Sequence, residues 1–333
     1  MASTDVRSIA EGFARTTALV VGDVMVDAYL WGRVDRISPE APVPVVQVTR
    51  RSARLGGAAN VALNAQALGA TATIATVVGD DPDADRIEAL LREQRSPIEG
   101  IVRSSQRRTT VKTRVISGHQ HVVRVDEEQE DELSQADERA LLDRIAMLMA
   151  ARRPDAIVLE DYNKGVLTAT VIEGVIRLAK QSGVPVAVDP KKRNFLTYHG
   201  VDLFKPNLKE LREGLKIEID PADDASINKA VRALEEKLAN RLSLVTLSEL
   251  GAYVHDHGVG TRIAAHKRKI VDVSGAGDTV IAVAALSLAQ GLDARNIAAL
   301  SNLAGGLVCE EVGVVPIDRD RFRAECERLH LPS

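Results

Sequence analysis

Short apolar runs alternate with helical stretches along most of the chain. Strands rich in Val, Ile and Leu are predicted at 18–23, 71–81, 156–161, 185–190, 202–207 and 242–248. Helices are predicted at 58–69, 83–94, 134–151, 168–182, 207–214 and 224–239, and two more after Asp278 and Asp293. Because continuously apolar strands need helices on both faces, the pattern predicts an α/β fold around a mostly parallel sheet.

Two segments interrupt this alternation. Residues 28–57 carry prolines and β-prone residues with little helical periodicity, and residues 107–128 alternate apolar and polar side chains as half-exposed strands do. The simplest interpretation is a small β-sheet lid formed by insertions at approximately 28–55 and 107–126. Two ordinary edge hairpins would give the same pattern. The acidic run at 126–132 is predicted to be a solvated loop.

Composition excludes several classes of protein. The 333 residues are 45% hydrophobic and 27% charged, and no linker divides them, so one domain over 1–333 is expected. A net charge of -4 argues against nucleic-acid binding and against a polybasic membrane surface. The sequence shows no signal peptide and no apolar run of membrane-spanning length, which predicts a cytoplasmic protein. Cys309 and Cys326 are too few for a disulfide framework and are expected to be inert thiols.

Polar residues and glycines collect directly after the predicted strands. Ligands of open parallel sheets bind beyond the carboxyl ends of the strands. Any one aspartate or asparagine there can be only a turn residue or a helix cap, but so many at one edge favour a site. The residues concerned are Gly22, Asp23, Asp27, Gly56, Gly57, Asn60, Asp161, Lys164, Asp189, Lys191, Asn207 and Glu210.

The stretch VDVSGAGDTV (271–280) places three small residues, Gly275, Ala276 and Gly277, before Asp278 at a predicted helix start. Backbone N–H groups without bulky side chains can converge there on an anion, which the helix dipole favours. Asp278 can then accept a proton from an attacking hydroxyl, provided that a metal ion offsets the nearby negative charge. Alone, the stretch is equally compatible with a tight turn and a dipole-stabilising aspartate.

Three motifs together carry a family resemblance. DVSGAGDT (272–279) resembles the C-terminal signature of the ribokinase-like, or PfkB, carbohydrate kinases. LGGAANVALNAQALG (55–69) resembles their N-terminal signature, and KPNLKE (205–210) their Asn-x-x-Glu motif. The order and spacing agree from about residue 16 to residue 318. The resemblance implies a ribokinase-like α/β/α sandwich with a small β-sheet lid, and phosphotransfer from ATP to an alcohol group.

Within that family, residues 22–45, 161–167 and 245–251 are similar to the heptose-7-phosphate kinases. Some of those kinases carry a second, nucleotidyltransferase domain with a His-x-Gly-His signature. The sequence ends at Ser333 without that signature, so the monofunctional form is expected.

The resemblance assigns expected roles to matching positions. Asp278 matches the catalytic base, and Gly275, Ala276 and Gly277 match the anion hole. Asn207 and Glu210 match the motif that holds Mg²⁺, usually through water. Lys205 departs from the pattern, because a smaller residue is expected before Pro206. Expected substrate contacts are Asp27, Gly56, Gly57, Asn60, Asp161 and Lys164; expected ATP contacts are Lys191, Lys192, Asn207, Lys209, Glu210, Ser248, Glu249, Gly251 and Asn302.

A phosphorylated sugar requires a second anion site, which the predicted lid can supply. Alternation places Lys112, Arg114 and Arg124 on one face of the strand pair, and Arg108 and His119 lie nearby. Guanidinium groups suit phosphate oxygens. Exposed charges on a solvated edge are the alternative. Three other histidines, His255, His257 and His266, are expected to be plain surface residues.

The resemblance implies ATP-dependent phosphorylation of D-glycero-β-D-manno-heptose 7-phosphate at O1, for the heptose of the lipopolysaccharide inner core. ATP and Mg²⁺ are the expected cofactors, and a monovalent cation is allowed. A homodimer through the lid is expected, because one-sided sheets commonly cover their apolar face. The alternatives are a kinase of another sugar phosphate or of a nucleoside, or a non-catalytic sugar-phosphate sensor. An aromatic content of 3% disfavours the nucleoside.

Overall fold

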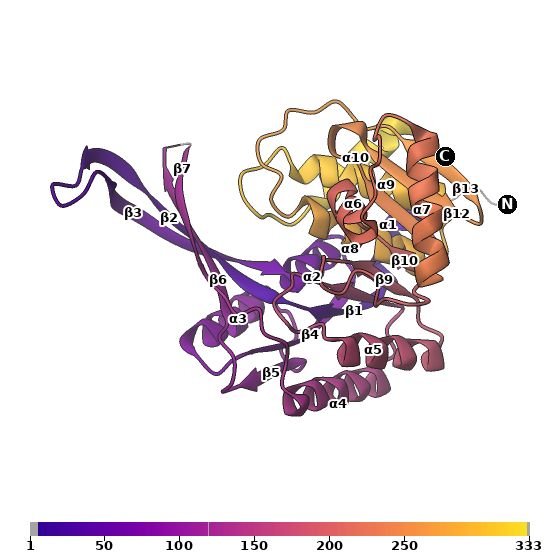
Figure 1. The fold of residues 1–333 in the computed structure, drawn as a ribbon, viewed down its shortest axis with the longest axis horizontal. Helices are drawn as coiled ribbons and strands as arrows, with labels where there is room; N and C mark the ends of the chain where they lie inside the picture. Colours follow the sequence, from indigo (N-terminus) through magenta and orange to yellow (C-terminus); the bar gives the residue numbers. More distant parts are fainter. Residues whose placement is uncertain (1–5, 119, 332–333) are drawn as a thin grey trace.

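The computed structural model describes residues 6–118 and 120–331, which form two β-sheets and their covering helices (Figure 1). The larger sheet has nine strands in the order β13-β12-β11-β10-β9-β8-β1-β4-β5. All neighbours are parallel except at β12, which is antiparallel to both β11 and β13. The strands are β1 (Thr17–Gly22), β4 (Thr71–Gly79), β5 (Ile101–Ser104), β8 (Ala156–Glu160), β9 (Val186–Asp189), β10 (Leu203–Phe204), β11 (Leu242–Thr246), β12 (Ala252–Asp256) and β13 (Val259–Ile263).

Helices cover both faces of this sheet, and each face has its own apolar core. Side chains of alternate strand positions enter opposite cores: Val20 lies in one, and Leu19 and Val21 lie in the other. One core is closed by α1 (Val6–Arg15), α2 (Ala58–Ala67), α3 (Pro82–Glu93), α8 (Ala276–Ala289), α9 (Ala294–Val308) and α10 (Arg319–Leu329). The other is closed by α4 (Gln135–Ala151), α5 (Ala169–Ser182), α6 (Leu208–Leu215) and α7 (Asp224–Leu238). The predicted α/β/α sandwich is confirmed.

The lid is a separate four-stranded sheet in the order β3-β2-β6-β7. Its strands are β2 (Val24–Ile37), β3 (Pro44–Gly57), β6 (Thr110–Ser117) and β7 (Gln120–Glu127). Figure 1 shows these strands extending away from the main body. Only Asp23 separates β1 from β2, so the chain passes directly from one sheet into the other. The lid interpretation is therefore correct, and the two segments are not separate hairpins on the edge of the main sheet.

Several elements were not predicted. They are the terminal helices α1 and α10, the four-residue β5, and the β12–β13 hairpin, whose sequence contains turn-forming Gly258. His255 was expected at the surface, but it is buried on β12, with Nδ1 2.9 Å from Glu235 Oε1. His257 is exposed and His266 is half-buried. Predicted strand 202–207 contracts to the two residues of β10.

Two further expectations can be compared with the described residues. Cys309 and Cys326 are both buried and free, as expected. Over the ranges that the structure describes, none of the helices is both long and apolar enough to span a bilayer.

Candidate active site

Asp278 lies in the first turn of α8 with only 3% of its surface exposed. Asn60 Nδ2 donates to its Oδ2 at 2.7 Å, and Tyr162 Oη donates to its Oδ1 at 2.7 Å. Burial raises the pKa of Asp278 to about 6, against the lowering effect of these two hydrogen bonds. A carboxylate with that pKa is ionised at neutral pH and can accept a proton there.

The start of α8 consists of small residues and has no side-chain cap in the described part of the chain. Gly275 has φ 78°, a left-handed conformation that favours glycine, and a Cβ there would meet Asn60 Nδ2 at 2.9 Å. No side chain among the described residues caps this helix, in contrast to α4, α5 and α9. No described side chain therefore occupies the N–H groups of the first turn, although the Ala276 N–H donates to the Val273 carbonyl at 3.3 Å. The anion hole at Gly275 to Gly277 stays a prediction.

Charged side chains crowd against this helix start. Glu160, Asp189 and Asp278 each present a carboxylate oxygen within 4.8 Å of the others. Burial, and then the charge of Asp189, raise the pKa of Glu160 well above its usual value. Lys205 Nζ lies 2.8 Å from Asp189 Oδ2, and 3.7 Å from where a Cβ on Gly277 would lie. The unexpected Lys205 thus belongs to a buried ion pair beside the predicted anion hole, in which Asp189 Oδ2 lies 3.5 Å from the same Cβ position.

The Asn-x-x-Glu motif forms the capping box of α6. Asn207 Oδ1 accepts from the Glu210 N–H at 2.8 Å, and Glu210 Oε2 accepts from the Asn207 N–H at 2.8 Å. Lys191 Nζ donates to Glu210 Oε1 at 2.6 Å. These oxygens already have protein partners, which fits a metal held through its water shell better than direct ligation. Lys209, which was predicted to contact ATP, does not take part in this capping box. Its side chain is 82% exposed, and its Nζ lies 3.8 Å from Glu213 Oε1.

A pocket of about 500 Å³ adjoins the start of α8. Four of the positions predicted to contact ATP line it together with Ala276 and Gly277, namely Ser248, Glu249, Gly251 and Asn302. The other predicted ATP contacts, Lys191, Lys192, Asn207, Lys209 and Glu210, are not among its lining residues. Ser248 has φ 54° and Gly251 has φ 89°, so the turn between β11 and β12 is sharply folded. The pocket and the helix start together form one continuous candidate nucleotide site.

The inner face of the lid carries the predicted cations. Strand register puts Asp27 opposite Lys112 and Tyr29 opposite Arg114, which in turn faces Arg124 across β6 and β7. The three cations therefore share a face with Asp27, as alternation predicts. Each has an acidic partner in this structure: Glu128 at 3.4 Å for Lys112, Asp27 for Arg114, and Asp126 at 2.9 Å for Arg124.

The sequence did not reveal how the inner lid face meets the body. Arg54 donates to the carbonyls of Val312 and Val314 at 3.1 and 2.8 Å. The Val314 N–H donates to Tyr29 Oη at 3.4 Å. Arg54 lies opposite Asp27 on β3, so this contact directs the face with Asp27 toward the body. In the sequence, only the register of β2 and β3 could have indicated which face of the lid meets the body.

Gly56 is needed beside Asp27, because a Cβ on Gly56 would meet Asp27 Oδ2 at 2.2 Å. Gly57, the next residue, has φ 62° and ends β3.

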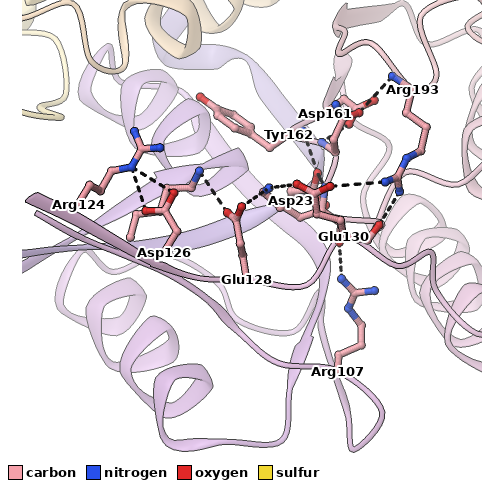
Figure 2. Close-up of polar contacts among 12 residues, drawn as sticks. Asp23, Arg107, Arg124, Asp126, Glu128, Glu130, Asp161, Tyr162 and Arg193 are labelled. Atoms are coloured by element: carbon pink, nitrogen blue, oxygen red, sulfur yellow. Dashed lines mark hydrogen bonds and ion pairs between the residues drawn. The ribbon is translucent and has the colours of Figure 1, made fainter.

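Two other predicted substrate contacts, Lys164 and Asp161, have protein partners. Figure 2 shows Asp161 in the same region as the acidic residues Glu128 and Glu130. Lys164 Nζ lies 2.9 Å from both Glu128 Oε1 and Glu130 Oε1, so the acidic run at 126–132 is not merely solvated. Asp161 Oδ2 accepts from Tyr198 Oη at 2.7 Å. Arg108 is exposed outside the lid strands, and His119 lies outside the described residues. Among the described residues, neither Asp161 nor Lys164 forms a hydrogen bond or an ion pair with Asp278.

The two-sheet fold, and a buried carboxylate beside an uncapped helix start and a pocket, define a phosphotransferase-like enzyme. The profile of the pfkB family carbohydrate kinases matches residues 15–319, and the chain belongs to that family. It is accordingly a phosphotransferase with an alcohol group as acceptor.

Curated relatives agree with this assignment. The chain is 42% identical to the Bifunctional protein HldE of Methylobacillus flagellatus over 93% of its own length and 63% of that protein. It is 39% identical to the Bifunctional protein HldE of Citrifermentans bemidjiense, covering 98% and 66%. The chain thus spans about two thirds of these curated relatives.

Similar folds occur in phosphofructokinase-2 from Escherichia coli in complex with potassium, with a TM-score of 0.77 and 19% identity over 95% of this chain and 99% of that one. Arabidopsis thaliana ribokinase complexed with ribose and ATP gives a TM-score of 0.71 and 18% identity, covering 93% and 99%. These likenesses concern the fold.

Proposed function

We propose that this chain transfers the γ-phosphoryl group of ATP to O1 of D-glycero-β-D-manno-heptose 7-phosphate, giving the 1,7-bisphosphate for lipopolysaccharide inner-core synthesis in the cytoplasm. The observation that carries the proposal is the place of Asp278. It lies at the helix start that adjoins the nucleotide pocket and contacts Asn60 of the predicted sugar site. Heptose is supported by the similarity of 22–45, 161–167 and 245–251 to the heptose-7-phosphate kinases.

In the proposed reaction, Asp278 accepts the proton of the anomeric hydroxyl. O1 then bonds to the γ-phosphorus while the bond from that phosphorus to the β,γ-bridging oxygen breaks, and ADP leaves with that oxygen. The N–H groups at 275–277 and the ammonium of Lys205 stabilise charge on the transferring group. Asp27 and Asn60 orient the sugar, so that the hydroxyl meets Asp278 in the reactive geometry.

Asn207 and Glu210 would hold Mg²⁺ through water, and the ion would offset the negative charge of the ATP phosphates. We expect Glu210→Gln to raise the Mg²⁺ concentration needed for half-maximal rate by about threefold to tenfold, because a neutral amide attracts the hydrated ion less. The KM for the sugar should stay close to that of the unmodified enzyme. Initial rates over a Mg²⁺ titration measure this, and an unchanged titration curve would contradict the role.

The 7-phosphate would bind the inner lid face. We expect Lys112→Ala or Arg124→Ala to lower kcat/KM for the sugar phosphate by about tenfold to a hundredfold, the equivalent of one charge-assisted contact. Activity on the dephosphorylated sugar should fall much less, since it never makes the contact. Comparing kcat/KM on both sugars tests this.

Arg51 supplies a matched control for the lid variants. Arg51 is on β3 and pairs with Leu30 of β2. Leu30 follows the inner-face residue Tyr29, and successive side chains of a strand alternate, so Arg51 is on the outer face of the same sheet. Arg51→Ala should leave the preference for the phosphorylated sugar unchanged. Equal losses on both sugars in all three variants would show that these cations only hold the lid together.

A homodimer through the outer lid face is supported by two exposed valines. Val123 and Val125 are 50% and 49% exposed on β7, and their register partners Val115 and Thr113 place them on the face opposite Asp27. Apolar side chains gathered on one face are commonly covered by a partner. Light scattering should give twice the 35.9 kDa of one chain, and a monomer at micromolar concentration would contradict this.

A panel of sugar phosphates and nucleosides, assayed for ADP release, separates the candidate functions. The proposal predicts the highest kcat/KM with the heptose 7-phosphate. A preference for another sugar phosphate or for a nucleoside would replace the substrate while keeping the chemistry. Binding of a sugar phosphate without ADP release would favour a sensor.

A further inference from the structure

We propose that Tyr162 is a positioning residue for the reaction, which holds Asp278 ionised and correctly oriented. The inference rests on the proposed role of Asp278 as base. Tyr162 was not among the predicted site residues, although it lies between two of them, Asp161 and Lys164. Its hydroxyl is one of two donors that contact the Asp278 carboxylate, each at 2.7 Å.

The two donors come from different elements, and each binds a different oxygen of the Asp278 carboxylate. Asn60 comes from α2 and contacts Oδ2, whereas Tyr162 follows β8 and contacts Oδ1. Asn64 Nδ2 donates to Asn60 Oδ1 at 3.2 Å, which leaves the Asn60 amide nitrogen directed at Asp278. One donor on each oxygen fixes the plane of the carboxylate. Loss of either would let it rotate about its terminal torsion, which has broad energy wells.

The backbone of Tyr162 is anchored by a buried carboxylate. Asp23 Oδ2 accepts from the N–H groups of Tyr162 at 2.8 Å and Lys164 at 3.0 Å, and Asp23 Oδ1 accepts from Val166 at 3.1 Å. Asn163 between them has φ 55°, and its N–H donates to Asp161 Oδ1 at 2.7 Å. Figure 2 shows the Tyr162 ring directed away from this anchored backbone. Tyr162 is therefore fixed at both ends, by Asp23 at its backbone and by Asp278 at its hydroxyl.

The charges around Asp278 affect its ionisation, and therefore the role of its hydrogen bond with Tyr162. Asp278 faces Glu160 at the end of β8 and Asp189 at the end of β9, while Lys191 lies 5.3 Å from the centre of the Tyr162 ring. Burial and the charge of Asp278 raise the pKa of Tyr162 well above its usual value, so the phenol stays protonated and acts as donor. A donor to a carboxylate favours its ionised form, which is the form that can accept a proton.

Tyr198 is a matched control. Its hydroxyl also donates to a buried carboxylate at 2.7 Å, but that carboxylate is Asp161 rather than Asp278. Tyr162→Phe and Tyr198→Phe each remove one phenolic oxygen that donates to a buried carboxylate. A merely structural role predicts similar consequences for the two variants.

The experiment compares both variants with the unmodified enzyme, using the panel substrate that gives the fastest turnover. We expect Tyr162→Phe to lower kcat by about tenfold to a hundredfold, the rate equivalent of one hydrogen bond to a charged group. The KM values should change by less than about threefold, and the acid limb of the kcat profile should move to higher pH. Tyr198→Phe should not move that limb. Identical kcat and pH profiles for the two variants would overturn the proposal.

A double variant separates this inference from the role of Asp278. If Tyr162 acts through Asp278, then Tyr162→Phe should cause little further loss in an Asp278→Asn background. Losses that add up fully would overturn the inference and leave Asp278 as base. Near-normal turnover of Asp278→Asn alone would overturn both, since Tyr162 would then have no base to position.

Discussion

Asp278→Asn should lower kcat by about two to four decades while the protein stays folded and still binds ATP. The amide is nearly isosteric, and it can accept from Asn60 and donate to Tyr162, so both contacts of the site can persist. What disappears is the ability to accept a proton from the sugar hydroxyl. Steady-state rates, ATP binding by calorimetry and thermal unfolding measure the three parts of this prediction. Turnover near that of the unmodified enzyme would remove Asp278 from the mechanism.

The same residue predicts the pH dependence. A base with a pKa of about 6 is protonated below that pH, so kcat/KM should fall as pH drops through 6 and level off above about 7. The residual rate of Asp278→Asn should lack this limb. If the limb persisted in the variant, another group would be responsible for it.

Lys205→Met should have the second largest effect, a loss of about two to three decades in kcat, comparable to removal of an oxyanion-stabilising donor. Lys205 and Asp189 form an ion pair in which both side chains are only 3% exposed. Removing one partner of such a pair also destabilises the fold, by roughly 3–5 kcal/mol. The free energy of unfolding must therefore be measured together with the rate.

A second substitution separates these two effects. Lys205→Met combined with Asp189→Asn removes the unpaired charge and should recover much of the stability, because no isolated buried carboxylate remains. Turnover should stay low, since no cation lies beside Gly277. Recovery of turnover together with stability would show that Lys205 supports the fold only.

The fold was largely predictable because its signal is local. Alternating apolar strands and helices specify the central sheet, and side-chain alternation at 107–128 specifies a second one. The missing elements had weak local signals. β5 has four residues, and the β12–β13 hairpin mixes histidine, aspartate and glycine with its apolar positions. His255 was misplaced because the strand that carries it was not predicted. On that strand it is buried and contacts Glu235 of α7.

The site was predictable in part, because motif positions do not state which partners they meet. Asn60 and Asp278 are 218 positions apart, and only the folded sheet brings them together. Lys164 was expected to contact substrate, but ion pairs with Glu128 and Glu130 engage it, and no sequence pattern encodes such a pairing. Lys205 was visible as an unexpected residue, and its position beside Gly277 required the structure. Tyr162 follows a strand end like many turn residues, so its contact with Asp278 could not be inferred.

We propose above all that this chain phosphorylates the anomeric hydroxyl of a sugar that already carries a phosphate. Phosphorus NMR of the product formed from ATP and D-glycero-β-D-manno-heptose 7-phosphate tests it most directly. A new anomeric phosphate resonance should grow in proportion to ADP while the 7-phosphate resonance is retained. Stoichiometric ADP formation with inorganic phosphate as the only new resonance, or a phosphate on any oxygen other than O1, would contradict it.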